Sequence, residues 1–180
     1  GYRVTTNTTV FNGVDEDDVI EMFEMVTEWG VEGVMVSPGY HFETIPNQDL
    51  FISRKNARKV FKNILDPVRK IRFYNNPLYL DFLRGEQEYQ CTAWSNPTYT
   101  VMGWREPCYL LGDRHTQDVN DLYEDAIWEK YGVGNDPRCA NCLMHCGFES
   151  ASIFSAMKSP KAAIKLIKEG AVQNSGMGAG

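Results

Sequence analysis

RVTTNTTVFNGVDEDDVIEMFEMVTEWGVEGVMVSPG, residues 3–39, holds two apolar segments separated by an amphipathic one. Residues 3–11 are rich in β-branched side chains, which predicts a largely buried strand. Asp15 is placed to cap a helix over residues 16–29. The apolar run at residues 33–36 predicts a second buried strand. A strand, a helix and a strand at this spacing form a βαβ unit, so we expect parallel strands with the helix on one face.

A unit of this kind needs further strands to cover it. A complete (βα)₈ barrel takes roughly 250 residues, and only two of its strands precede a change of pattern here. The first residue is Gly1 rather than methionine. We therefore expect the C-terminal part of a longer protein, although a truncated expression product or a small open α/β domain would give the same pattern.

Composition and charge exclude several classes of protein. Of 180 residues, 43% are hydrophobic and 23% are charged, which is typical of a soluble globular chain. The net charge of -6 argues against nucleic acid as a partner, because phosphate binding needs a positive field. No apolar stretch approaches the roughly 20 residues that cross a bilayer, and no signal-peptide pattern is present. We expect a cytoplasmic protein.

The rest of the chain alternates helical and irregular patterns. Helices are expected over residues 54–65, 77–83, about 116–130 with Thr116 as the cap, 149–157 and 160–169. The helix beginning at residue 54 has a cationic outer face, which is either a solvated surface or a contact with anionic lipid through residues 54–62. Residues 71–74 form a candidate strand, residues 86–115 are irregular or short-stranded, and residues 174–180 are expected to be disordered.

The strongest chemical signal is a set of five cysteines. They are Cys91, Cys108, Cys139, Cys142 and Cys146. The last three form a C-x₂-C-x₃-C run, and Cys91 and Cys108 form C-x₁₁-G-x₄-C with Gly103 between them. Clustered cysteines in an intracellular chain are more often metal ligands or catalytic groups than disulfides.

Three interpretations fit this cysteine pattern. The first is a structural zinc site with four cysteines, or with His145 in place of one of them. The second is a set of five thiols without a metal. The third is an iron–sulfur cluster held by four thiolates, which accepts scattered ligands and leaves one cysteine spare.

Several separated motifs resemble one known family. The C-x₁₁-G-x₄-C … C-x₂-C arrangement is similar to the auxiliary-cluster pattern of SPASM/twitch extensions on radical S-adenosylmethionine (SAM) enzymes. The segments TTNTTVF, GVEGVMVSPGYHFE, FYNNPLYLDFLRG, CTAW, GWREPCYLL and CANCLMHCGFE resemble the C-terminal half of the hopanoid-biosynthesis radical SAM family, the adenosyl-hopene transferases. The resemblance covers about residues 1–155.

The resemblance implies a particular α/β fold and division into domains. Residues 1–50 would be the C-terminal strands and helices of a partial (βα) radical SAM barrel. Residues 51–155 would be a family-specific domain containing a small α+β cysteine-rich auxiliary-cluster subdomain. Residues 156–180 would add a terminal helix and the disordered tail.

The resemblance also implies an activity, with its partners. Family members cleave SAM at a [4Fe-4S] cluster held by a C-x₃-C-x₂-C motif, and the 5′-deoxyadenosyl radical adds to hopene to give adenosylhopane. That motif is missing from this chain, so the SAM-cleaving cluster is expected upstream and the chain alone is expected to be inactive. The implied partners are a triterpene substrate, the N-terminal remainder of the protein and an electron donor such as flavodoxin or ferredoxin. The alternatives are the same architecture acting on another substrate, and a zinc-stabilised binding module without enzymatic activity.

The site residues are carried over motif by motif. The expected ligands of the auxiliary [4Fe-4S] cluster are Cys91, Cys108, Cys139 and Cys142, and Cys146 is able to replace one of them. The expected SAM contacts are Gly33, Met35 and Pro38, which loosely follow the G-x-I-x-x-L pattern beside adenine, and Asn7, which could instead be a polar residue satisfying a strand end. Radical addition leaves a carbon radical that needs a hydrogen atom, and Cys146 is the candidate catalytic donor. The alternative roles for Cys146 are cluster ligand and buried thiol.

Overall fold

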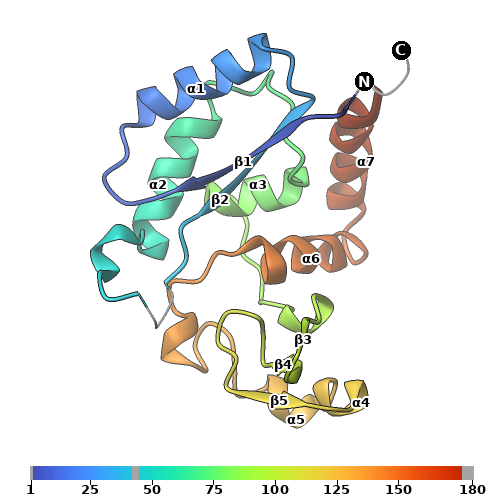
Figure 1. Ribbon diagram of the computed structural model, residues 1–180. Coiled ribbons are helices and arrows are strands. Elements are labelled where there is room, and N and C mark those ends of the chain that lie inside the picture. Colours follow the sequence, from blue (N-terminus) through green and yellow to red (C-terminus); the bar gives the residue numbers. More distant parts are fainter. Residues whose placement is uncertain (1, 42–44, 176–180) are drawn as a thin grey trace.

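The computed structural model describes residues 2–41 and 45–175 as an α/β structure with two small sheets (Figure 1). The strands are β1 (Thr5–Val10), β2 (Gly33–Pro38), β3 (Tyr99–Thr100), β4 (Gly103–Glu106) and β5 (Arg114–Thr116). The helices are α1 (Glu16–Glu28), α2 (Arg54–Leu65), α3 (Pro77–Leu83), α4 (Val119–Leu122), α5 (Asp125–Trp128), α6 (His145–Ala156) and α7 (Pro160–Ser175). Short 3₁₀ turns lie at η1 (Gln48–Leu50), η2 (Ala93–Ser95) and η3 (Pro137–Cys139). Helix α6 separates the β1–β2 sheet from the β3–β4–β5 sheet (Figure 1).

The predicted βαβ unit is confirmed. Strands β1 and β2 pair in parallel, and α1 connects them. Asp15 caps α1 by accepting a hydrogen bond from the backbone N–H of Asp17 at 3.0 Å. Phe73 forms a parallel bridge with Val34 of β2, so only one residue of the predicted strand 71–74 is bridged. The chain therefore places β1, β2 and Phe73 side by side in sequence order.

The expectation that the first strand is largely buried is wrong. Within β1 only Val10 is buried, whereas Thr5, Asn7 and Thr9 are exposed. In the part of the chain that the structure describes, β1 pairs with β2 alone, so it forms an edge of the sheet. β-branched residues favour a strand whether one face or both faces are covered. The composition of β1 therefore predicted a strand but could not predict how much of it is buried.

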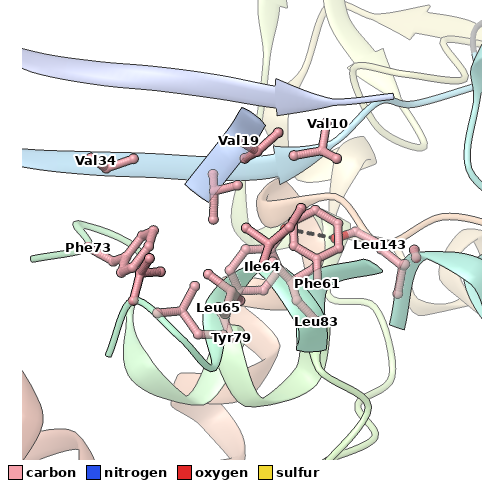
Figure 2. Packing of buried hydrophobic residues seen from close by; sticks show 14 of the residues in the cluster. Val10, Val19, Val34, Phe61, Ile64, Leu65, Phe73, Tyr79, Leu83 and Leu143 are labelled. Atoms are coloured by element: carbon pink, nitrogen blue, oxygen red, sulfur yellow. Dashed lines mark hydrogen bonds between the residues drawn. The ribbon is translucent and has the colours of Figure 1, made fainter. Parts of the chain in front are cut away.

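One apolar core joins the sheet to the helices. Val10 and Val34 from the strands pack with Phe61 of α2, and the cluster continues to Leu143 (Figure 2). The hydroxyl of Tyr79 in α3 donates to the carbonyl oxygen of Leu143 at 2.8 Å (Figure 2). The predicted boundary between residues 1–50 and 51–155 stays a prediction, and this core contains residues from both sides of it.

The single helix predicted over residues 116–130 is wrong. Two four-residue helices, α4 and α5, take its place. Thr116 belongs to β5, where it pairs with Trp104, and Asp118 caps α4 by accepting from the N–H of Asn120 at 2.9 Å. A carboxylate is a stronger N-cap than a threonine hydroxyl, which explains why the helix begins after Asp118.

The two C-terminal helices differ from their predicted bounds. Helix α6 begins at His145, four residues early, so its first turn contains Cys146. Helix α7 begins at Pro160 as predicted but continues through Gly170 to Ser175. A glycine inside a helix costs only about 1 kcal/mol relative to alanine, so Gly170 does not end the helix. Of the predicted tail, residues 174–175 belong to α7 and residues 176–180 lie outside the described residues.

Candidate metal centre

All five cysteines line one cavity of about 530 Å³. They come from separate segments of the fold: Cys91 before η2, Cys108 after β4, Cys139 at the end of η3, Cys142 in the following turn, and Cys146 in the first turn of α6. Each is half-buried and none forms a disulfide. The fold thus gathers thiols that lie up to 55 residues apart, counted from position 91 to position 146, around one space.

Cys91 is held against the start of α6. The backbone N–H and the hydroxyl of Thr92 each donate to the carbonyl oxygen of Gly147, both at 3.1 Å. The Thr92 hydroxyl also lies 3.0 Å from that of Ser150. A Cβ at position 147 would collide with the sulfur of Cys91, so only glycine allows this approach. The glycine after Cys146 therefore fixes the position of Cys91.

Arg54, the first residue of α2, holds the segment between Cys139 and Cys142. Its backbone N–H donates to the side-chain oxygen of Asn141 at 3.1 Å, and its guanidinium donates to the carbonyl oxygen of Cys142 at 2.8 Å. The same guanidinium lies over Phe82 and Phe148, with its Cζ 5.0 and 5.2 Å from the ring centroids. A helix that is otherwise amphipathic thus directs one cation towards the cysteines.

The expectation that all the cations of α2 lie on an outer face is therefore wrong in part. Glu88 draws Arg54 and Arg58 into ion pairs on one side of the helix. Lys55, Lys59 and Lys62 are exposed. Sequence reasoning missed Arg54, but a signal was present. A cation in the first turn opposes the helix dipole, which is the one unusual feature of Arg54 in the sequence, although the exposed Lys55 shares it.

A second ion-pair network, centred on Arg138, joins the segments that carry Cys108 and Cys139. Arg138 forms paired hydrogen bonds with Asp113 at 2.7 and 2.8 Å and also contacts Asp136 at 2.7 Å. Hydrogen bonding from Arg138 lowers the pKa of both carboxyl groups. Asp113 follows the Cys108 segment and Arg138 precedes Cys139, so the network connects these two cysteine-bearing turns.

Backbone N–H groups point at the sulfur atoms. The donors are Ala93 to Cys91, Leu110 and Leu111 to Cys108, Gly132 to Cys139, Met144 to Cys142, and Gly147 to Cys146. Donors of this kind stabilise a negative sulfur and are among the features that set the reduction potential of thiolate-bound metal clusters. These hydrogen bonds lower the pKa of each thiol and offset part of the opposite effect of burial.

Burial acts against that charged state in the absence of a cation. It raises the pKa of every one of the thiols, to about 12 for Cys91 and for Cys146. Neighbouring thiolates raise the values further for every thiol except Cys108, where the raising charge is Asp113. Three arginines lower them in part, Arg54 near Cys91, Arg105 near Cys108 and Arg138 near Cys139. Several thiolates can therefore coexist here only with a metal that compensates their charge, and binding of the metal would release protons.

The five thiols are the main candidate donors of the cavity, and Glu129 is the one carboxylate among its lining residues. His145 does not line the cavity, and burial lowers its pKa. Within residues 2–41 and 45–175, no three His, Cys, Asp or Glu side chains are arranged to hold a single metal ion. A zinc ion draws its sulfur ligands to about 2.3 Å from one centre, whereas a cluster binds each thiolate through a different iron. Among the described residues the structure therefore shows a cavity shared by the thiols but no preformed metal-binding group.

A family model extends over this region. The model described as Domain of unknown function (DUF3463) matches residues 34–166, from β2 into α7. The chain belongs to the DUF3463 family. All five cysteines and Arg54 lie within the matched part of this DUF3463 chain, and β1 lies outside it. Comparison with curated proteins gave no match, and comparison with solved structures gave none either.

The predicted SAM contacts of the DUF3463 chain lie on the β1–β2 sheet. Asn7 and Met35 are register partners on neighbouring strands, with Asn7 exposed and Met35 half-buried. Gly33 and Pro38 are the two ends of β2, five steps apart, which separates them by roughly 16 Å at about 3.3 Å per residue. The structure thus brings Asn7 and Met35 together and keeps Gly33 away from Pro38.

The carboxyl end of β2 leads to the cysteine cavity. Tyr40 follows Pro38 by two residues and lines the cavity wall with Cys142 and Phe148. Burial and the neighbouring cysteine thiolates raise the pKa of Tyr40 well above its ordinary value. Sequence reasoning did not single out Tyr40, although its place just after a parallel strand is where ligand-binding side chains gather in α/β folds.

Proposed function

We propose that this chain carries the auxiliary [4Fe-4S] cluster of a radical SAM enzyme. The observation that supports the proposal is the convergence of five thiols on one cavity of about 530 Å³. Cys91, Cys108, Cys139 and Cys142 would hold the cluster, and Cys146 would be the spare cysteine. When bound, such a cluster supplies one-electron transfer beside the cavity.

The walls of the cavity suit a buried cluster. Tyr40, Trp94, Trp128 and Phe148 line it and give the space between the thiols an aromatic wall. A dry shell and nearby positive charge both influence the reduction potential of a metal site. The guanidinium groups of Arg54, Arg105 and Arg138 each lie near a different cysteine, so the protein provides positive charge around a cluster that carries net negative charge.

The parallel arrangement of β1, β2 and Phe73 supports the proposal of a partial barrel. In (βα)₈ barrels neighbouring parallel strands follow one another in chain order, with helices outside and the active site at their carboxyl ends. The cysteine cavity lies towards that end of β2 through Tyr40. Asn7, Met35, Gly33 and Pro38 remain proposed SAM contacts, of which Asn7 and Met35 are adjacent in the sheet.

The proposed overall reaction is adenosyl transfer to hopene by the complete enzyme. The C-x₃-C-x₂-C motif would be supplied by the N-terminal remainder, and electrons by a flavodoxin or ferredoxin. Radical addition to the alkene forms one C–C bond and leaves a carbon radical. Cys146 would donate a hydrogen atom to that radical, and the resulting thiyl radical would need one electron and one proton from the donor system to be restored. Two functions compete with this one. The same architecture could act on another substrate, or the chain could be a zinc-stabilised binding module.

A series of single Cys→Ala variants tests the ligand assignment. Each variant of the chain is reconstituted without oxygen, and bound iron and the visible absorption of the cluster are measured. We expect Ala at 91, 108, 139 or 142 to abolish the cluster and Cys146→Ala to retain it. His145→Ala serves as the control, because this side chain does not line the cavity. Loss of the cluster with Cys146→Ala, and its retention with one of the other four, would instead make Cys146 a ligand.

A separate proposal is that residues 54–62 contact a membrane surface through the exposed face of α2, away from the cysteine cavity. Among the described residues, none of the helices combines the length and the apolar character needed to cross a bilayer. Lys55, Lys59 and Lys62 are the exposed cations of α2 that would approach anionic headgroups. We expect flotation with liposomes that contain phosphatidylglycerol and its loss at high salt. Binding that changes neither with salt nor with the anionic lipid content would contradict a contact between α2 and anionic headgroups.

A further inference from the structure

A second cavity, of about 490 Å³, lies between the segment after α2 and helix α7. Arg72 and Phe73 line it, and Val34 near the start of β2 hydrogen-bonds to the backbone of Arg72 at 2.9 Å. The cavity therefore sits at the amino end of the parallel strands, whereas the cysteine cavity lies towards their carboxyl end. None of the cysteines lines it. We call this space the basic groove.

The charge of the basic groove is opposite to that of the chain. Five cations line it, namely Arg69, Lys70, Arg72, Arg84 and Lys165, against one carboxylate, Glu169. The whole chain has a net charge of -6. A concentration of cations in a concave site on an acidic protein focuses the field on a negatively charged ligand.

Two of these cations form ion pairs with a buried carboxylate. Asp81 is buried with 4% of its surface exposed, and its carboxylate forms ion pairs with Arg84 and with Lys165. The side chain of Arg84 is itself only 11% exposed. One carboxylate shared between an α3 cap residue and an α7 residue fixes the two sides of the groove relative to each other.

Two further cations lack a carboxylate partner. In the described part of the chain, neither Lys70 nor Arg72 forms an ion pair. The guanidinium of Arg72 stacks on Tyr74 with its Cζ 5.0 Å from the ring centroid. Its Nε is buried and has no hydrogen-bond partner among the described residues. Lys70 and Arg72 therefore keep positive charge at the groove that no carboxylate of the described residues neutralises.

The floor of the groove is apolar. Leu65, Phe73 and Leu80 line it and are almost completely buried. Ligand pockets of this size are usually apolar with a few polar groups that fix orientation. A planar guanidinium beside an ammonium suits the several oxygens of a phosphate group better than a single carboxylate.

We propose that the basic groove binds a phosphate group carried on an apolar molecule. Lys70 and Arg72 contact the phosphate oxygens, and the apolar part lies on Leu65 and Leu80. The phosphate comes either from a free amphiphilic phosphate ester or from the headgroup of an anionic lipid. This site is independent of the cysteine cavity and of the function proposed for it.

The test is titration calorimetry of the chain with dodecyl phosphate below its micellar concentration, with inorganic phosphate as the competitor. We expect saturable binding that is weakened roughly tenfold or more in the Lys70→Gln/Arg72→Gln variant, because charge-assisted hydrogen bonds to the ligand are lost. The control is Lys158→Gln/Lys161→Gln, which removes the same charge from exposed residues outside the groove. The control should bind as the wild type does.

Sedimentation with vesicles distinguishes the two sources. Vesicles of phosphatidylcholine are compared with vesicles that also contain phosphatidylglycerol, for the wild type and both variants. Binding of dodecyl phosphate that inorganic phosphate displaces supports a free phosphate ester. Binding to phosphatidylglycerol vesicles alone, lost in Lys70→Gln/Arg72→Gln and kept in the control, supports a lipid headgroup. The absence of both kinds of binding, or equal loss in the control variant, overturns the proposal.

Discussion

Arg54 illustrates how a single residue connects the helical core to the cysteines. It occupies the first turn of α2, where a cation opposes the helix dipole. Its hydrogen bond to the carbonyl of Cys142 and its position over Phe82 and Phe148 compensate for that cost. With a side chain only 14% exposed, Arg54 fixes the turn that carries Cys142.

Replacing Arg54 should therefore destabilise the chain. We expect Arg54→Gln to lower the free energy of unfolding by about 2 kcal/mol, the range for a hydrogen bond that involves a charged group. The measurement is urea unfolding followed by circular dichroism. Lys55→Gln removes the same charge from the exposed neighbouring position and should change stability by less than about 0.5 kcal/mol. Equal losses in the two variants would show that the contacts of Arg54 contribute nothing.

The second prediction at the residue scale concerns Gly147. Its backbone contacts the sulfur of Cys91, so Gly147→Ala should destabilise the chain by about 1–3 kcal/mol through overpacking. In a Cys91→Ala background the sulfur is gone, and the same substitution should be neutral or slightly stabilising because alanine favours the helix. A double-mutant cycle of unfolding free energies measures the difference. Identical effects in both backgrounds would contradict the contact.

Residue-scale reasoning from sequence identified the thiols but missed their neighbours. The spacing of the cysteines predicted a shared site, and all five line one cavity. Arg54 and Tyr40 were missed because their roles depend on where α2 and the end of β2 lie relative to residues roughly a hundred positions away. Periodicity within a segment carries no information about such contacts.

At the scale of elements, periodic segments were predicted well and short ones were not. Helices α1, α2 and α3 follow their apolar patterns and their capping residues. The segment 116–130 breaks into α4 and α5 because Thr116 is used by β5. Sheet pairing competes with helix formation through contacts that a local pattern does not show.

The turn at Asp113 and the turn at η3 are joined by Arg138, which predicts a dependence of stability on pH. Arg138 lowers the folded-state pKa of Asp113 and Asp136 below the ordinary value of 3.8. A lowered pKa contributes stability above the unfolded-state pKa, and that stability is lost as the pH falls through the folded-state pKa.

Arg138→Gln should therefore be less stable than the wild type at neutral pH, and the difference should shrink as the pH falls below 3.8. Urea unfolding across the acid range measures it. Arg138→Lys keeps the charge but loses the paired hydrogen bonds, so it should lie between the two. A difference that stays constant down to full protonation would show that the two carboxyl groups are not linked to Arg138.

On the scale of the whole molecule, two cavities of different chemistry lie towards opposite ends of the strands. The cysteine cavity lies beyond the carboxyl end of β2, and the basic groove lies at the amino end. A single apolar core connects them through α2 and α3. The cysteine pattern predicted that these thiols share a site, and all five line the first cavity. The second comes from α7 packing beside residues 69–73, and the sequence gives no local sign of that packing.

The central proposal is that four of the five thiols hold a [4Fe-4S] cluster. The most direct measurement is iron, sulfide and zinc analysis of the chain purified and reconstituted without oxygen, with electron paramagnetic resonance of the dithionite-reduced sample. We predict about four irons and four sulfides per chain, with the signal of a reduced [4Fe-4S] cluster. One zinc per chain, with no iron bound even after reconstitution, would contradict the account and favour a zinc-stabilised module.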